Sequence, residues 1–220
     1  MERRLEPELM DDEAQAQAYA ESDFVAVNQG FVDRFLEAFP DLRDGRVLDL
    51  GCGPADIPLR LCRALPEVEV VAVDGSEAML ALARKALRAA GRVGERVTLE
   101  LARLPDSALP DRGFDAVISN SLLHHLPEPA VLWAEVRRLA MPGAPILIMD
   151  LVRPRDELSA QAIVANAGCS EDPLLIRDFY ASLLAAFTLD EVRAQLRAAD
   201  LAHLDVAQVS ERHLLVSGRL

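Results

Sequence analysis

The chain has little of what marks secreted or membrane-spanning proteins. It holds only three cysteines among 220 residues, and their odd number and spacing fit neither a disulfide framework nor a metal site. Its longest apolar runs, such as residues 144–149, are too short to cross a membrane. The charged start, residues 1–7, has no apolar stretch behind it and does not resemble a secretory signal. We therefore expect a cytoplasmic protein that makes no membrane contact.

Basic residues are also scarce relative to acidic ones. The chain has 23 Lys and Arg against 36 Asp and Glu, a formal net charge of −13. A protein that holds nucleic acid by neutralising phosphates needs the opposite balance, so a nucleic-acid partner is not expected. The apolar fraction of 51% and the charged fraction of 27% are ordinary for a globular protein.

The middle of the chain, residues 45–150, alternates short apolar runs with amphipathic stretches of helical spacing. This alternation predicts a parallel sheet with helices on both faces. The predicted strands are 46–50, 68–73, 96–101, 114–120 and 145–150, and the predicted helices between them are 55–65, 76–91 and 129–139.

The two ends of the chain differ from this middle part. Residues 1–44 have helical patterns at 11–20 and 22–39, and we expect them to form a helical lid or cap over a main domain of residues 45–220. Three further helices are expected at 156–167, 172–187 and 189–199. Two strand-like stretches, 202–209 and 212–217, are separated by only two residues, which permits a hairpin but no parallel crossover. The sheet should therefore include an antiparallel strand.

The first strand runs into a glycine-rich turn with an acid before it. Asp49 precedes Gly51 and Gly53, and the second strand ends in Asp74. A dinucleotide site would have a third glycine, but Asp56 occupies that position. Two carboxylates beside a pyrophosphate would repel it, so the turn suits a ligand that carries an amino group and no phosphate. An NAD(P)-dependent oxidoreductase is disfavoured for the same reason.

Several ordered motifs resemble those of the class I methyltransferases that depend on S-adenosylmethionine (SAM). They are the glycine turn with Asp74, residues 114–119 and 122–126 around the fourth strand, residues 135–139, and the Pro142-Gly143 pair before the fifth strand. The resemblance covers about residues 45–150 and extends loosely to the final hairpin. It implies an α/β, Rossmann-like, seven-stranded and mostly parallel sheet in the order 3-2-1-4-5-7-6, with the seventh strand antiparallel.

The resemblance also implies a cofactor, SAM, with S-adenosylhomocysteine as product, and roles for particular residues. Gly51 and Gly53 would let the backbone approach the ligand, because a Cβ would collide there. Asp49 would hold the amino group and Asp74 the two ribose hydroxyls. Cys52 would contribute only backbone. The remaining expected cofactor-binding residues are Gly75, Ser76, Met79, Arg103, Leu104, Ser119 and Asn120.

Arg103 departs from the family pattern. It stands where the family often has an acid that binds the adenine amino group, and arginine cannot accept that hydrogen bond. Either Asp106 substitutes, or Arg103 stacks on the base while backbone atoms read its edge.

Candidate catalytic residues follow from where parallel strands end. His124 and His125 follow the fourth strand, and Asp150 ends the fifth. One histidine could act as a general base while the other packs or caps, and both could merely shape the loop. Asp150 could orient the acceptor or cap the next segment. No metal is expected, because no further ligand lies at a useful spacing from the histidines.

The expected function is methyl transfer from SAM to a small-molecule acceptor. The alternatives are a methyltransferase that acts on a protein or tRNA, a SAM-binding module without turnover and, less favoured, an NAD(P)-dependent oxidoreductase. The sequence does not determine the acceptor or the oligomeric state. Candidate acceptor-binding residues are Tyr19, Asn28, Arg153, Tyr180 and Arg212.

Overall fold

The computed structural model describes residues 1–6, 12–21, 24–105, 108–167 and 172–220. Asp106 and one of the three cysteines, Cys169, lie outside these ranges.

One seven-stranded sheet forms the centre of the molecule, in the order β3-β2-β1-β4-β5-β7-β6. Strands β1 to β5 pair in parallel, and β7 is antiparallel to both β5 and β6. The predicted order and the antiparallel final strand are confirmed. The strands are β1 Asp44–Leu50, β2 Glu67–Asp74, β3 Val97–Leu101, β4 Ala116–Asn120, β5 Pro145–Leu151, β6 Asp205–Gln208 and β7 His213–Arg219.

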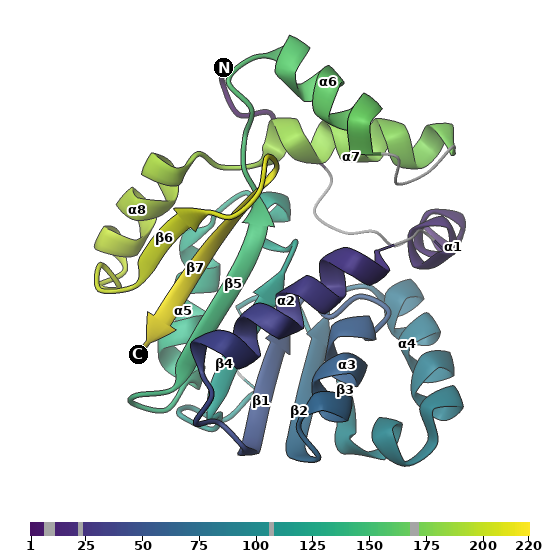
Figure 1. Cartoon of the computed structure of the whole chain (residues 1–220), viewed down its shortest axis with the longest axis vertical. Helices are drawn as coiled ribbons and strands as arrows, with labels where there is room; N and C mark the ends of the chain where they lie inside the picture. Colours follow the sequence, from purple (N-terminus) through teal and green to yellow (C-terminus); the bar gives the residue numbers. More distant parts are fainter. Residues whose placement is uncertain (7–11, 22–23, 106–107, 168–171) are drawn as a thin grey trace.

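Helices cover both faces of this sheet (Figure 1). Helices α2, α3 and α4 pack on one face, and α5 and α8 pack on the other. The described helices are α1 Glu13–Glu21, α2 Val25–Ala38, α3 Asp56–Ala64, α4 Glu77–Ala90, α5 Ala130–Leu139, α6 Glu157–Ala167, α7 Pro173–Ala185 and α8 Leu189–Ala198, with short 3₁₀ turns η1 Gly91–Arg96 and η2 Leu123–His125. Each helix in this set is too short or too polar to cross a lipid bilayer.

Local sequence signals set several of these boundaries. The Ser76 side chain accepts a hydrogen bond from the backbone N–H of Met79, which caps α4 as its sequence predicts. Gly91 ends the same helix with φ +56°, a conformation that favours glycine. Thr188 and Glu191 form a capping box at the start of α8.

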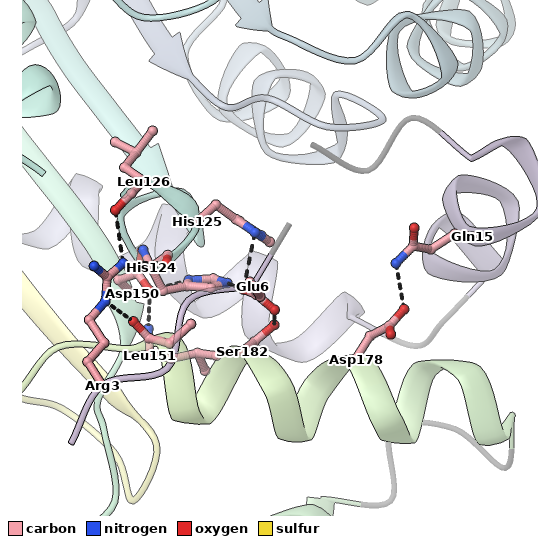
Figure 2. Close-up of polar contacts among 11 residues, drawn as sticks. Arg3, Glu6, Gln15, His124, His125, Leu126, Asp150, Leu151, Asp178 and Ser182 are labelled. Atoms are coloured by element: carbon pink, nitrogen blue, oxygen red, sulfur yellow. Dashed lines mark hydrogen bonds and ion pairs between the residues drawn. The ribbon is translucent and has the colours of Figure 1, made fainter. Parts of the chain in front are cut away.

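Two parts of the N-terminal region lie in different places in the fold. Helix α2 buries Phe31, Val32 and Phe35 against the sheet, so most of this helix is part of the core. Residues 1–6 instead run along α7 and η2, far from α2 in the fold (Figures 1 and 2). A lid function for residues 1–44 stays a prediction.

Candidate active site

A large pocket lies at the carboxyl ends of β1, β2, β4 and β5, where an open α/β sheet is expected to bind its ligand. One end is bordered by the glycine turn and the start of α4, and the other by η2, α6, α7 and the β6–β7 hairpin. We call these the cofactor end and the acceptor end.

At the cofactor end, backbone hydrogen bonds hold the glycine turn against β2. The N–H groups of Gly51 and Cys52 both donate to the Val73 carbonyl, at 2.8 and 2.9 Å. Gly51 has φ +78°, and a Cβ there would lie 3.0 Å from the Leu122 Cβ. A side chain at this position would be strained in conformation and tight against its neighbour, so the turn requires glycine.

The Asp74 carboxylate is fixed by two backbone donors. Its Oδ2 accepts from Gly53 N and its Oδ1 from Ser76 N, both at 2.8 Å. The side chain is therefore held in one orientation at the pocket wall before any ligand binds. A preorganised carboxylate of this kind suits a pair of vicinal hydroxyls.

Asp49 and Cys52 are buried beside this turn. Burial, with a smaller contribution from Asp74, raises the pKa of Asp49 to about 8. Burial also raises the pKa of the Cys52 thiol well above its usual value, so a reactive thiolate does not form. Among the described residues, neither these two nor Ser119, whose Oγ donates to the Leu50 carbonyl at 2.7 Å, borders the pocket.

At the acceptor end, His124 is buried between two carboxylates (Figure 2). Its Nδ1 lies 2.6 Å from Asp150 Oδ1, and its Nε2 lies 3.4 Å from Glu6 Oε1. Burial alone would lower the pKa of His124, but the two carboxylates together raise it. Burial would raise the pKa of Asp150, but His124, the Leu151 N–H and His125 together lower the pKa of that carboxyl.

Glu6 comes from the N-terminal segment and contacts both histidines. Its Oε1 lies 3.2 Å from His125 Nδ1, and its Oε2 accepts a hydrogen bond of 3.1 Å from the Ser182 hydroxyl on α7. Burial raises the pKa of the Glu6 carboxyl, although His124 opposes that effect. The carboxylate thus connects the first residues of the chain to η2 and α7.

Arg3 anchors this segment. Its guanidinium donates to the carbonyls of Ala185, His124 and Leu126, at 2.5, 2.9 and 2.9 Å. It also stacks over the Phe187 ring, 3.9 Å from the centroid. These contacts fix where Glu6 lies relative to the histidines.

Comparison with known proteins agrees with this arrangement. Residues 47–143 match the model of a methyltransferase domain family. The chain is 28% identical over 179 residues to 27-O-demethylrifamycin SV methyltransferase of Amycolatopsis mediterranei, covering 81% of this chain and 62% of that protein. It is 33% identical over 115 residues to the ubiquinone/menaquinone biosynthesis C-methyltransferase UbiE of Geobacter sulfurreducens, covering 52% of this chain and 44% of that one.

A solved SAM-dependent methyltransferase from Aquifex aeolicus shares the fold. It superimposes with a TM-score of 0.68 at 20% identity and covers 94% of this chain and 98% of that one. Over residues 47–143 the chain is therefore similar to methyltransferase domains, and it shares the fold of a SAM-dependent methyltransferase. It spans less than two thirds of the length of the two curated relatives named above.

The sequence motifs predict SAM as cofactor, and the similar solved structure is a SAM-dependent methyltransferase. The cofactor end fits SAM: Asp74 offers a fixed acceptor for hydroxyls, and the pocket there is bordered by the expected residues Gly51, Gly53, Gly75, Ser76, Met79, Arg103, Leu104 and Asn120. Arg103 borders the pocket as expected for stacking, whereas Asp106 lies outside the described residues, so both accounts of adenine binding stay predictions.

The expected acceptor-binding residues divide into two groups. Tyr19, Asn28 and Arg212 border the pocket. Arg153 and Tyr180 do not border it: the Arg153 guanidinium pairs with Glu191 at 2.6 Å, and Tyr180 packs in the apolar cluster between α6 and α7. His124 and His125 border the pocket, while Asp150 lies behind His124.

Two titratable groups that border the pocket are held neutral near pH 7. Burial is the main cause that raises the pKa of Tyr19 to about 12, with Asp74 and Asp56 adding to it. Burial, assisted by Arg212, lowers the pKa of His213 to about 4. Both side chains therefore offer hydrogen bonds without charge.

Several residues of the acceptor end were missed by the sequence analysis. Glu6 and Arg3 lie in a polar stretch with no pattern of its own, and their contacts join positions more than a hundred residues apart. The helical patterns of α6 and α7 predicted the helices but not which side chains would face the pocket. The residues of α7 that border it are Leu175, Ile176, Asp178, Phe179 and Ser182.

Proposed function

We propose that this protein transfers the methyl group of SAM to a small-molecule acceptor that is largely apolar and carries at least one polar group. One observation supports this above all: the cofactor end and the acceptor end form a single continuous pocket. Methyl transfer is an in-line displacement, which requires donor and acceptor in one space from which water is excluded.

The walls of the acceptor end suggest the class of acceptor. Val164, Leu175 and Phe179 give it an apolar surface, and Asp178 and Arg212 give it charged groups. One relative, which matches 81% of this chain, is named for a small molecule, 27-O-demethylrifamycin SV. An apolar molecule with a hydroxyl group suits these walls better than a protein or tRNA segment.

When bound, SAM supplies an electrophilic methyl group on a sulfonium. Asp74 would hold the ribose, and the turn at Gly51 would admit the ligand close to the backbone. At the other end, His124 and His125 would present polar edges to the acceptor, with Asp150 fixing the His124 ring. The acceptor would gain the methyl group, and the proton that it releases would pass to one of these imidazoles or to water.

Calorimetry with SAM, S-adenosylhomocysteine and NAD tests the cofactor. Binding of NAD without SAM would contradict the proposal. Formation of S-adenosylhomocysteine over a panel of hydroxylated apolar molecules, bulk tRNA and unfolded protein then tests the acceptor, and mass spectrometry of co-purifying molecules guides the panel. Tight SAM binding without turnover on any of these would indicate a binding module instead.

We also assign this reaction to the cytoplasm. In the described part of the chain, Cys52 and Cys62 are both free thiols, as expected for a reducing compartment.

A further inference from the structure

Three potential metal ligands converge at the acceptor end (Figure 2). They are Glu6 Oε1, His124 Nε2 and His125 Nδ1, and all three atoms lie within 4.8 Å of one another. The carboxylate comes from the N-terminal segment and the imidazoles from η2, so the group exists only in the folded chain. Glu6 is therefore a third ligand, which the spacing of residues along the sequence did not indicate.

The Glu6 oxygen at the centre of this group lacks a hydrogen bond. Its side chain is 7% exposed, and Oε1 accepts no hydrogen bond from the described residues. The nearest ring nitrogens, His124 Nε2 and His125 Nδ1, lie 3.4 and 3.2 Å from it, but neither is aligned to donate a hydrogen bond to it. A buried carboxylate oxygen is costly without a positive partner.

The two distances match those between ligands of one metal ion. Ligand atoms about 2.0–2.1 Å from a tetrahedral zinc ion lie about 3.3 Å from each other. The Glu6–His124 and Glu6–His125 distances, 3.4 and 3.2 Å, have this length. Two ligand atoms whose lone pairs point at a shared ion do not point at each other. This agrees with the lack of hydrogen-bond alignment between the Glu6 oxygen and the two imidazole rings.

Residues that contact the ligands orient them in the way that is usual in protein metal sites. Asp150 Oδ1 lies 2.6 Å from His124 Nδ1, so in the neutral ring the proton is on Nδ1 and the lone pair of Nε2 is directed at Glu6. The Ser182 hydroxyl donates to the second oxygen of Glu6. A histidine ligand backed by a carboxylate is the usual arrangement around protein-bound zinc.

We propose that Glu6, His124 and His125 bind a divalent transition-metal ion, with zinc the best match to two imidazoles and one carboxylate. His124 and His125 border the pocket, so the remaining coordination position would open towards the acceptor. An ion there could bind an acceptor oxygen and ease loss of its proton. This catalytic use rests on the proposed function, whereas the binding of the ion does not.

Binding can be measured directly on the full chain, after removal of any affinity tag and treatment with a chelator. Co²⁺ is added as the probe, and its visible d–d absorption reports coordination by nitrogen and oxygen ligands. Zn²⁺ affinity follows by calorimetry and stoichiometry by elemental analysis. We expect one ion per chain. Glu6→Gln and His125→Asn should each weaken binding by more than about 100-fold, since even groups behind the ligands change metal affinity by about 10–100-fold.

The matched control is His203→Asn, which removes an exposed imidazole outside the pocket and should leave metal affinity unchanged. Circular dichroism establishes that each variant is folded. Absence of a stoichiometric ion in the wild type would overturn the proposal, as would equal affinity in the wild type and Glu6→Gln. SAM affinity, measured on the same samples, separates this result from the proposed function, because SAM binding without metal rejects only the metal site.

Discussion

The two ends of the pocket are built in different ways. The cofactor end draws mainly on one continuous strand–turn–helix–strand unit, in which backbone donors fix Gly51 and Asp74. The acceptor end joins the N-terminal segment, η2, the end of β5 and α7 through side-chain contacts between distant positions. The first end is set by local backbone geometry, and the second by packing between distant parts of the chain. Each end should therefore fail independently of the other.

The largest expected effect is at the cofactor end, on replacing Asp74 by Ala. The change removes the acceptor for two ribose hydroxyls, and hydrogen bonds to a charged group contribute about 1.5–3 kcal/mol each. We expect SAM affinity to fall roughly 1000-fold, measured by calorimetry. Asp205→Ala, which removes an exposed carboxylate from β6, should bind SAM as the wild type does. Unchanged affinity in Asp74→Ala would remove Asp74 from the ribose role.

A second effect at the cofactor end concerns pH and stability. The pKa of Asp49 is about 8 in the folded chain and about 3.9 in an unfolded one. Between these values the folded state keeps a proton that the unfolded chain releases. The free energy of unfolding should therefore fall as pH rises, by up to about 1.4 kcal/mol per pH unit.

Asp49→Asn should remove that part of the pH dependence, because asparagine does not ionise. Urea unfolding at pH 5, 6 and 7 measures this pH dependence. The difference in unfolding free energy between Asp49→Asn and the wild type should change by up to about 3 kcal/mol over this range. Asp44→Asn, at the exposed start of the same strand, is the control. Parallel pH profiles for Asp49→Asn and the wild type would show that Asp49 is ionised in the folded chain.

The smallest effect is expected at the acceptor end, on replacing Arg3 by Ala. The variant loses three hydrogen bonds to carbonyls and the contact with Phe187. Since Arg3 is only half-buried, we expect a loss of about 1–2 kcal/mol in unfolding free energy. SAM affinity should stay within about twofold, because the cofactor end is untouched.

Arg4→Ala provides the matched comparison for Arg3. It removes the same charge from the next residue, but Arg4 makes an exposed ion pair with Glu157, and such pairs contribute little. Thermal unfolding should separate the two variants. Equal shifts would mean that the N-terminal segment is not anchored through Arg3.

The sequence predicted the fold well because its signals are local. Alternating runs, the Ser76 cap, the Gly91 stop and the short link before β7 each depend on neighbouring residues, and the structure confirms the sheet they predict. Residues that border the cofactor end were predicted for the same reason, since the turn and Asp74 belong to adjacent strands.

The acceptor end was predicted less completely because its contacts are long-range. Arg153 follows β5 as expected, but its guanidinium pairs with Glu191 at the start of α8. Tyr180 is on a predicted helix, but α7 turns that face to α6. Glu6 reaches the histidines only because Arg3 docks on carbonyls near both of them. Hydrophobic periodicity in the sequence gives no indication of contacts between such distant residues.

The position of β7 has a consequence for how the chain folds. Strand β5 is buried along its whole length, and its neighbour on one side is β7, close to the end of this sequence. During synthesis, residues 145–151 therefore present an apolar, unpaired edge until residues 213–219 have left the ribosome. Such an edge is a template for aggregation. Chaperone dependence and misassembly during expression should accordingly be sensitive to changes in the β6–β7 hairpin, far from the pocket's cofactor end.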